Sequence, residues 1–422
     1  MIKQYIKQAI QSFNENRLVG VLSILGTALA VAVTLVLVLV FQINSSGFEP
    51  ESNRDRFLYI FSTEVKAVGN GFSNRGNMSA EVVRECFYTL REPEAVAAYF
   101  RIKHPVSLPN SRQFRRYECC FTDAGYWNVF DHQFVEGRAF TQSDFDSAIP
   151  KAVISQRMAR RFFGEDTAVG KQLVVDFVSY TVAGVVKDVP NPLMVSYFDL
   201  CMPYTCNGQL MALNSNYGEN MVGSFSVIML ARSSADFELV RAELDRQSSR
   251  YNEGKVDYKL DFPTGPLSQL DTAMGSNGFR KVDWREYLLD SGFIFLLLLL
   301  VPALNLMGVV HTSIQKRGEE IALRKAFGAT KGDLLFQILV ENLLQTLVGG
   351  VLGLLLSVIL LLASKSFMLN PGIEITPTML IQPGWFAAAF IFTFLLNLLS
   401  AGLPAWGVLR RPLISSLRGS EG

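Results

Sequence analysis

The sequence predicts a membrane protein that has four transmembrane α-helices and a large α+β extracytoplasmic domain inserted between helices 1 and 2. Three observations lead to this fold class. Four stretches of membrane-spanning length carry no charged side chain, a long interval at residues 44–290 separates the first two, and this interval alternates strand-like with helix-like patterns. The composition agrees, because 49% of the 422 residues are hydrophobic and only 18% are charged.

The four uncharged stretches predict the transmembrane helices. An α-helix rises about 1.5 Å per residue, so about 20 apolar residues cross a hydrocarbon core of about 30 Å. A buried helix of a soluble protein rarely runs this far without a charge. The predicted helices lie at residues 19–43, 291–311, 334–363 and 385–409.

The first stretch is predicted to be an uncleaved anchor. Its basic flank, residues 1–18, and the small residues of "ALAVAV" would also fit a signal peptide. However, a signal peptide usually has an apolar core of about 7–15 residues, and this apolar run is longer. We therefore expect residues 1–18 to form an amphipathic segment in the cytoplasm.

Lysine and arginine are distributed unevenly among the short segments. They are frequent at residues 1–18, 312–333 and 410–422, whereas residues 364–384 contain only Lys365. Because cytoplasmic loops carry the excess of basic residues, both termini are expected in the cytoplasm and the α+β interval outside it. Topology thus accounts for the basic residues, and the net charge of +1 gives no indication of nucleic-acid binding.

The interval 44–290 contains two strand–helix–strand patterns. The first consists of the strand-like "RFLYIFSTEVKA", a helix that Ser79 is expected to cap, and the strand-like "AVAAYFRIKHPVSL". The second consists of "GSFSVIMLARSS" as a strand, "ADFELVRAELDRQSSRY" as a helix and "KVDYKLDF" as a strand. They bracket an insert at about residues 109–221, so we expect two subdomains.

The insert is predicted to be rich in strands. "KAVISQRMARRFFG" begins as a strand, becomes helical at Ser155 and ends at Gly164, a usual C-terminal residue of helices. "KQLVVDFVSYTVAGVVKDV" predicts two strands joined by a bend.

No catalytic or nucleotide-binding motif is recognisable in the sequence. A phosphate-binding G-x-x-x-x-G-K-[ST] loop and a G-x-S-x-G nucleophile elbow are both absent. The histidines His104, His132 and His311 are too far apart in the sequence to suggest a metal site. Asp144 and Asp146 resemble part of a calcium loop but lack its glycine and distal glutamate, so we interpret them as solvated loop carboxylates.

The five cysteines all fall in the α+β interval. An odd number that includes the adjacent Cys119 and Cys120 is not a disulfide framework. The sequence leaves open whether Cys201 and Cys206 form a disulfide or all five are unpaired, partly buried thiols.

An amphipathic helix is predicted in the cytoplasmic segment "EEIALRKAFGATKGD". Its apolar residues share one face, and the pair Glu320–Arg324 lies opposite at a favourable spacing. Glu319 lies in the first turn, where the helix dipole favours a negative charge, and Gly328 is expected to end or bend the helix. Ile321 stands among the charges, where it either anchors a protein partner or is a single exposed apolar residue without a role.

Glu341 lies at the edge of the third predicted transmembrane helix. The other predicted helices contain no Asp, Glu, Lys or Arg, which argues against an ion-coupled solute pump. Glu341 is expected either to reach the lipid headgroups or to face a partner helix.

Several stretches resemble the FtsX/MacB-type family of ABC transporter permeases. "NLMGVVHTSIQKRGEEIALRKAFGATKGDLLFQILVENLLQTLVGGVLGLLL" resembles the family's signature region. "FVEGRAFTQSDF", "KAVISQRMARRFFGEDTAVGKQL" and "YTVAGVVKDVP" are similar to its periplasmic domain, and "RRPLISSLRG" resembles its C-terminal ending. The residues that match the signature are Arg317, Glu320, Ile321, Arg324, Lys325, Gly328, Ala329, Glu341, Gly349 and Gly350.

The resemblance implies a homodimeric or heterodimeric permease of the bacterial inner membrane, with porter-like and sabre-like periplasmic subdomains. MacB itself carries its ATPase in the same chain, whereas this sequence shows no such domain. A separate ABC ATPase subunit, which would bind ATP and magnesium, is therefore expected to dock on the cytoplasmic segment 312–333. A periplasmic adaptor and an outer-membrane duct are further expected partners. The expected ATPase-coupling residues are Arg317, Glu319, Glu320, Ile321, Arg324, Lys325, Gly328 and Ala329, and the expected helix-packing residues are Gly349, Gly350 and Gly353.

Two functions of different classes follow from these patterns. The leading hypothesis is a permease subunit that couples ATP hydrolysis in its partner to movement of the periplasmic domain (mechanotransmission), for export or extraction of peptides, drugs or lipoproteins. The chain itself is then expected to be no enzyme and to hold no catalytic residue, cofactor or metal. The alternative is a membrane-anchored sensor or scaffold with a periplasmic ligand-binding domain, which leaves the coupling signature unexplained.

Overall fold

The computed structural model describes most of the first 290 residues and part of the remainder. The described residues are 17–45, 47–69, 71–111, 113–189, 195–212, 219–289, 292–293, 296, 327, 330–368, 384, 387, 391 and 395. The chain divides into two compact units. We call them the helical unit (residues 1–43, 288–371 and 375–422) and the α+β unit (residues 44–287 with 372–374).

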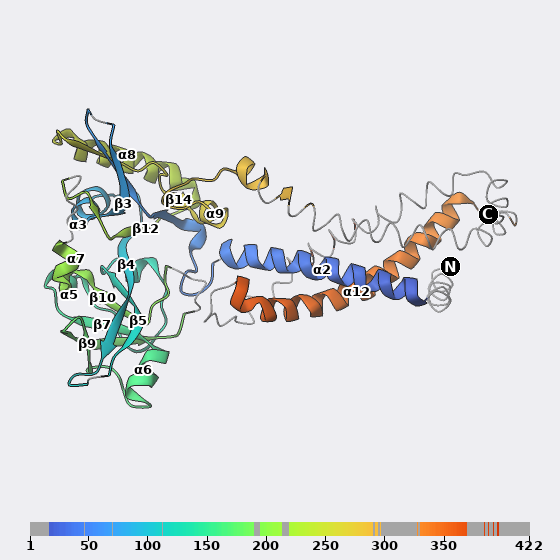
Figure 1. Ribbon diagram of the computed structural model, residues 1–422, viewed down its shortest axis with the longest axis horizontal. Coiled ribbons are helices and arrows are strands. Elements are labelled where there is room, and N and C mark those ends of the chain that lie inside the picture. Colours follow the sequence, from blue (N-terminus) through green and yellow to red (C-terminus); the bar gives the residue numbers. More distant parts are fainter. Residues whose placement is uncertain are drawn as a thin grey trace. The chain divides into compact units, whose positions relative to one another are not determined.

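Two long helices are the main described elements of the helical unit (Figure 1). Helix α2 spans Arg17–Ser45 and contains the first predicted transmembrane segment. Helix α12 spans Lys331–Met368 and contains the third. Among the described residues, no helix combines the length and the apolar character required to cross a membrane. The four-helix topology therefore stays a prediction.

The elements of the α+β unit are mostly short. The strands are β1 Phe57–Ile60, β2 Thr63–Ala67, β3 Ser73–Met78, β4 Ala95–Ser107, β5 Arg115–Thr122, β6 Phe134–Gly137, β7 Lys151–Ser155, β8 Gln172–Val175, β9 Val178–Val186, β10 Leu200–Pro203, β11 Val222–Gly223, β12 Ser226–Leu230, β13 Tyr258–Asp261 and β14 Leu267–Ser268. The α-helices are α3 Ala80–Val82, α4 Tyr126–Val129, α5 Gln142–Asp146, α6 Gln156–Phe163, α7 Gly208–Ala212, α8 Phe237–Glu253 and α9 Gln269–Ala273. The remaining helical turns are η1 Arg54–Arg56, η2 Val83–Phe87 (a π-helical turn), η3 Tyr204–Cys206 and η4 Ser234–Asp236.

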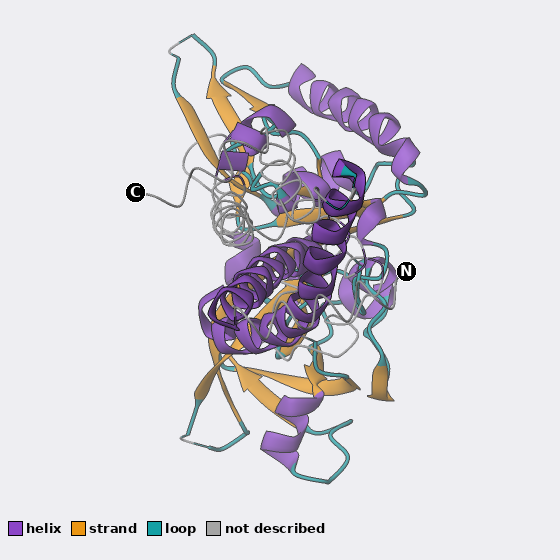
Figure 2. Cartoon of the chain, turned by 90° about the vertical axis from the view of Figure 1, so that its right-hand side faces the viewer, coloured by secondary structure: helices purple, strands orange, loops and turns teal. Residues whose placement is uncertain are grey.

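These strands form one ten-stranded and one four-stranded sheet. The large sheet has the order β14-β1-β12-β4-β5-β10-β7-β9-β6, and β8 pairs with β4 and β9. In it, β10 is parallel to β5 and β7 is parallel to β9. The small sheet has the order β11-β3-β2-β13 and is antiparallel. Figure 2 shows the strands in orange and the helices in purple.

The α+β architecture predicted for the interval 44–290 is confirmed, together with several local signals. The hydroxyl of Ser79 accepts a hydrogen bond from the Val82 amide and caps the helical turn that follows. Helix α6 begins directly after Ser155 and ends at Gly164, whose φ of 67° is the left-handed conformation that glycine allows. The two predicted strands of "KQLVVDFVSYTVAGVVKDV" are β8 and β9.

The stretch "RFLYIFSTEVKA" does not form the single strand that the sequence predicts. It breaks after Ile60, so that β1 belongs to the large sheet and β2 to the small sheet. All four residues of β1 are buried, as expected for a strand covered on both faces, whereas β2 mixes buried with exposed residues. At the break, the Ser62 hydroxyl donates a hydrogen bond to the carbonyl of Gly278. The chain therefore changes sheets at a residue whose side chain binds a distant segment.

Asp144 is not the solvated loop carboxylate that we expected. It is buried in the first turn of α5, where it forms a capping box with Thr141. Its Oδ1 also accepts a hydrogen bond of 2.7 Å from Nζ of Lys151. Together these bonds hold the pKa of Asp144 below its usual value, with the Lys151 bond as the largest cause. Asp146, two residues later, is exposed.

The strands of the predicted insert extend the sheet that the flanking segments begin. Strand β4 pairs with β12 on one side and with β5 of the insert on the other. Alternate residues of β1 enter different clusters: Leu58 and Ile60 join one core, whereas Phe57 and Tyr59 join a second, aromatic core. Successive side chains of a strand point to opposite faces of its sheet. The two cores therefore cover the two faces of the large sheet at β1.

Candidate functional site

The residues predicted to contact an ATPase lie outside the described residues. These are Arg317, Glu319, Glu320, Ile321, Arg324, Lys325, Gly328 and Ala329. Glu341 falls within α12, but its side chain is also outside the described part. The structure therefore informs the function through the glycines of α12 and through the segments by which the chain enters and leaves the α+β unit.

Two predicted packing glycines lie where α12 approaches α2. A Cβ atom at Gly349 would be 2.8 Å from Cβ of Thr27, and one at Gly353 would be 2.7 Å from the carbonyl oxygen of Ala28. These distances are too short for carbon contacts, so any side chain there would push the helices apart. Gly350 is buried beside them. Small residues of this kind let two helices approach closely.

The entry and exit segments of the α+β unit meet in one pair of strands. The chain enters through residues 47–56 into β1 and leaves through β14 and residues 269–287. Strands β1 and β14 are antiparallel neighbours, with Leu58 opposite Ser268. A displacement of either segment would therefore reach the edge of the same sheet.

A buried ion pair fixes the entry segment. Nε of Arg54 donates to Oε2 of Glu51 at 2.5 Å, and the two side chains are 5% and 1% exposed. The other carboxylate oxygen of Glu51 accepts a hydrogen bond of 3.0 Å from the amide of Ser196. One residue earlier, the Pro50 carbonyl accepts a bond of 2.9 Å from the amide of Asp131. The entry segment is thus bound to two distant parts of the large-sheet region.

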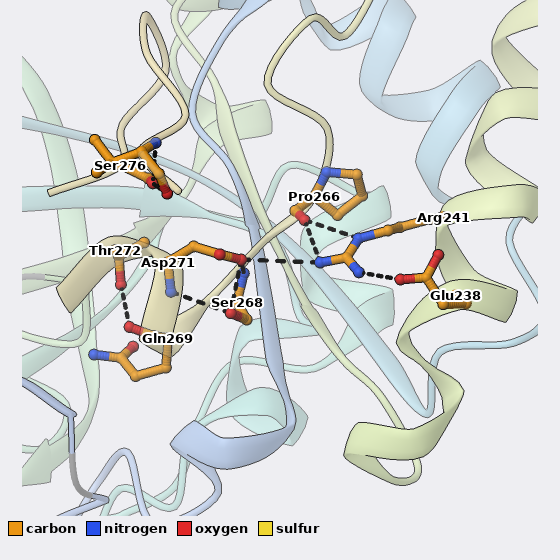
Figure 3. Close-up of polar contacts among 9 residues, drawn as sticks. Glu238, Arg241, Pro266, Ser268, Gln269, Asp271, Thr272 and Ser276 are labelled. Carbon is orange, nitrogen blue, oxygen red and sulfur yellow. Dashed lines mark hydrogen bonds and ion pairs between the residues drawn. The ribbon is translucent and has the colours of Figure 1, made fainter. Parts of the chain in front are cut away.

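Arg241 of α8 holds the start of the exit segment (Figure 3). Its Nε and Nη2 donate to the carbonyl oxygen of Pro266 at 3.2 and 3.0 Å, and Nη1 donates to Glu238. Nη2 also lies 3.9 Å from Oδ2 of Asp271. That carboxylate accepts bonds from the amide and hydroxyl of Ser268 and so caps α9. One guanidinium therefore joins α8, the residue before β14 and α9.

Further bonds join the exit segment to both sheets. The Tyr59 hydroxyl of β1 donates to Oε1 of Gln269 at 2.6 Å. Arg75 of β3 donates to the carbonyl of Phe279 at 2.8 Å, and Ser62 binds Gly278 at the break between the sheets. Movement of the exit segment would therefore act on the large and the small sheet together.

Two titratable residues, Asp123 and His132, contact members of the aromatic core. Asp123 accepts hydrogen bonds from the Ala98 and Tyr126 amides, and burial raises its pKa to about 6. His132 packs against Tyr126, Trp127 and other rings, and burial lowers its pKa to about 3. Within the described part of the chain, both ring nitrogens of His132 are buried without a hydrogen-bond partner.

Two other kinds of functional site, a metal site and a reactive thiol, depend on particular groupings or environments of side chains. Among the described residues, no group of His, Cys, Asp and Glu side chains is arranged to hold a metal ion. The five cysteines are free thiols, including Cys201 and Cys206. Burial raises the pKa of Cys86 to about 12 and that of Cys206 to about 11, so neither is an activated nucleophile.

Most of these connecting residues carry no signal in the sequence. Ser268 and Asp271 are an exception, because S-x-x-D is a sequence pattern typical of a helix N-terminus. Arg241 and Glu51 gain their partners only when distant segments come together, so no local spacing predicts them.

Two family descriptions match this chain in order. Residues 21–247 match the MacB-like periplasmic core domain, and residues 292–413 match the FtsX-like permease C-terminal domain. The first match alone covers more than half of the chain. The chain belongs to the FtsX/MacB-type family of ABC transporter permeases. The second match contains the whole segment predicted to contact an ATPase, as well as the three predicted packing glycines Gly349, Gly350 and Gly353.

Individual relatives of this FtsX/MacB-type permease differ in how much of their length it covers. YknZ, an ABC transporter permease of Bacillus subtilis (strain 168), is 25% identical over 361 residues, which are 83% of this chain and 84% of YknZ. The macrolide export ATP-binding/permease protein MacB of Escherichia coli (strain K12) is 26% identical over 298 residues, 69% of this chain but only 42% of MacB. The crystal structure of the extracellular domain of YknZ aligns with a TM-score of 0.33 and 18% identity, over 47% of this chain and 98% of that domain.

Proposed function

We propose that this chain is the permease subunit of an ABC transporter in the bacterial inner membrane, with four transmembrane helices and both termini in the cytoplasm. A separate ATPase subunit binds and hydrolyses ATP with magnesium. The permease converts this hydrolysis into movement of the α+β unit in the periplasm. The observation that carries the proposal is the FtsX-like match at residues 292–413, which follows the MacB-like match in the family's order.

The bonds around the entry and exit segments support this mechanism. A helix that moves transmits force only if the segments that follow it are firmly bound to the driven domain. The entry segment has the buried Glu51–Arg54 pair, and the exit segment has Arg241 and Tyr59. Both lead into neighbouring strands of one sheet, so the permease can pull on the α+β unit without a substrate channel.

The wider assembly is part of the same proposal. Two permease subunits, identical or different, form the transporter, and the close α2–α12 crossing packs the helices of each. A periplasmic adaptor and an outer-membrane duct complete it where the task is export. The cargo is a peptide, a drug or a lipoprotein; macrolide export is said of MacB, to which this chain is similar over part of its length.

Co-purification with an ATPase tests the proposal. The full-length chain, solubilised in detergent with ATP and magnesium, should retain a P-loop ATPase encoded by the same organism. Ile321→Asp should weaken this complex about 30-fold, because a lost interface anchor costs about 2 kcal/mol. Ile321→Leu is the matched control and should retain the ATPase. If the wild-type chain never retains an ATPase, the proposal fails and the sensor or scaffold hypothesis replaces it.

The coupling of ATP hydrolysis to export can be measured separately from binding of the ATPase. In membranes that hold the complex, Arg324→Glu should leave ATP hydrolysis running while export falls, because the charge reversal disturbs docking and not the ATPase itself. Membrane levels equal to wild type are the required control. A loss of the protein from the membrane would instead indicate that Arg324 is needed for folding.

A further inference from the structure

A surface hollow lies on the α+β unit between the β4–β5 hairpin and α6. Its volume is about 580 Å³, within the range of pockets that hold a peptide side chain or a small ligand. It contains none of the residues that bind the entry and exit segments. The residues that matter below are Phe114, Arg115, Tyr117, Arg161 and Phe162.

Three aromatic rings form the apolar part of the lining of the hollow. Tyr117 and Phe162 lie with ring centroids 5.5 Å apart, which joins strand β5 to helix α6. Phe114, just before β5, is 67% exposed. An exposed phenylalanine adds little to folding, and covering it would release about 25 cal/mol per Å² of apolar surface.

Two arginines beside these rings lack a counter-charge among the described residues. Arg115 and Arg161 line the hollow, and neither makes an ion pair or a side-chain hydrogen bond with the described part of the chain. Two other cations nearby are paired: Arg157, on the same helix as Arg161, donates to Asp199 at 2.7 Å, and Lys171 pairs with Asp166. Each free guanidinium offers a planar set of donors that fits a carboxylate.

We propose that this hollow binds an extended peptide segment of a partner protein in which a carboxylate stands beside an apolar side chain. Arg115 and Arg161 hold the carboxylate, while Phe114, Tyr117 and Phe162 cover the apolar side chain. The side-chain amide of Gln113, also in the lining, bonds to the main chain of the peptide. An acyl chain would leave that amide unused, so a peptide fits better than a lipid. This inference does not depend on coupling to an ATPase.

Fluorescence anisotropy with a defined probe tests the site. The probe is a capped, fluorescein-labelled peptide with a central Asp-Phe pair, added to the full-length protein in detergent. Arg115→Glu and Arg161→Glu should each raise Kd at least tenfold, because a charge-assisted hydrogen bond becomes a repulsion. The matched controls are Arg116→Glu and Arg160→Glu, which change an adjacent exposed arginine outside the lining and should bind as wild type does. A probe with Asn in place of Asp should also bind at least tenfold more weakly.

Three results would overturn the proposal. Equal losses in all four charge-reversal variants would show binding to positive charge in general rather than to this hollow. Binding of phosphatidylglycerol vesicles, but not of the peptide, in a manner sensitive to Arg161 would make it a lipid site. A change in oligomeric state with Arg161→Glu, without peptide binding, would make it a contact between two copies of the chain. Unfolding is monitored by Tm, and Arg161→Gln, which removes the charge without reversing it, replaces the Glu variant if that variant unfolds.

Discussion

Asp123 and His132 both contact Tyr126 of the aromatic core but affect the pH dependence of stability in opposite directions. Burial raises the pKa of Asp123 from 3.8 to about 6, so the folded chain binds that proton more tightly than the unfolded chain. Its contribution to stability is full below about pH 4 and is lost as the pH rises through 6. Burial lowers the pKa of His132 from 6.5 to about 3. Its contribution is full above about pH 6.5 and is lost as the pH falls toward 3.

We predict that His132→Phe protects the protein against mild acid. At pH 7 the change should be neutral or slightly stabilising, because the imidazole nitrogens are buried without partners and the surroundings are aromatic. At pH 5 the variant should be more stable than wild type by about 2 kcal/mol. This is the free energy by which protonation of His132 in the unfolded chain destabilises the wild-type protein at that pH. Tm measured on the full-length protein from pH 7.5 to 4.5 checks this.

Asp123→Asn is the counterpart variant and should act in the opposite sense. In the wild type, the folded chain gains stability on acidification because Asp123 takes up a proton, and this gain offsets the loss caused by His132. The Asn variant lacks the gain, so its Tm should fall more steeply than that of wild type between pH 6 and pH 4.5. Parallel Tm profiles for wild type and both variants would contradict the assignment of the pH dependence to this pair.

Among the elements, the contact of α8 with the exit segment depends on one side chain. We predict that Arg241→Ala loosens residues 266–279, because the Pro266 carbonyl and the α9 capping box lose the guanidinium that joins them. Hydrogen exchange of the amides in α9 should become about tenfold faster, which corresponds to about 1.4 kcal/mol. Export should also fall if this segment transmits movement.

Arg246→Ala is the matched control for Arg241. Arg246 lies on the same helix, is exposed and makes no ion pair with the described residues. Its exchange pattern and export should equal those of wild type. Faster exchange confined to α8 itself would indicate that Arg241 stabilises only its own helix.

The crossing of α2 and α12 gives a second prediction at the element scale. Gly353→Val should separate the helices, because even a Cβ would come within 2.7 Å of the Ala28 carbonyl and of Cβ of Val31. Overpacking of this kind costs about 1–3 kcal/mol, and the Tm of the detergent-solubilised protein should fall accordingly. Gly332→Ala, also on α12 but with no atom nearer than 3.7 Å, is the control and should not lower Tm.

Local chemistry decided which elements could be predicted from the sequence. Ser79, Ser155 and Gly164 act on residues within one helical turn, so a single sequence shows them. At the break between β1 and β2, the Ser62 hydroxyl binds the carbonyl of Gly278, more than 200 residues away, and no pattern near residue 62 reveals this contact. The prediction for Asp144 is wrong for a different reason: the T-x-x-D pattern of Thr141 and Asp144 is that of a capping box, and a capping carboxylate is bound rather than solvated.

For the whole molecule, composition predicted the division into a helical part and an α+β part. The two compact units divide near residues 43 and 288, close to the boundaries that uncharged stretches suggest. Composition does not reveal which distant side chains bind the entry and exit segments. Those partners depend on the order of strands in the large sheet. Family motifs, rather than physical patterns, marked residues 317–329 as the ATPase contact.

Cysteine labelling tests the proposed topology of the whole chain. In a Cys206→Ser background, the four remaining cysteines are buried and should not react. Phe177→Cys, at a fully exposed residue of the α+β unit, should react with a membrane-impermeant maleimide on intact spheroplasts. Ile321→Cys should react only after the membrane is permeabilised, because the basic segment around it is expected in the cytoplasm. Labelling of Ile321→Cys on intact spheroplasts would place that segment outside, where no ATPase could reach it, and would contradict both the topology and the proposed coupling.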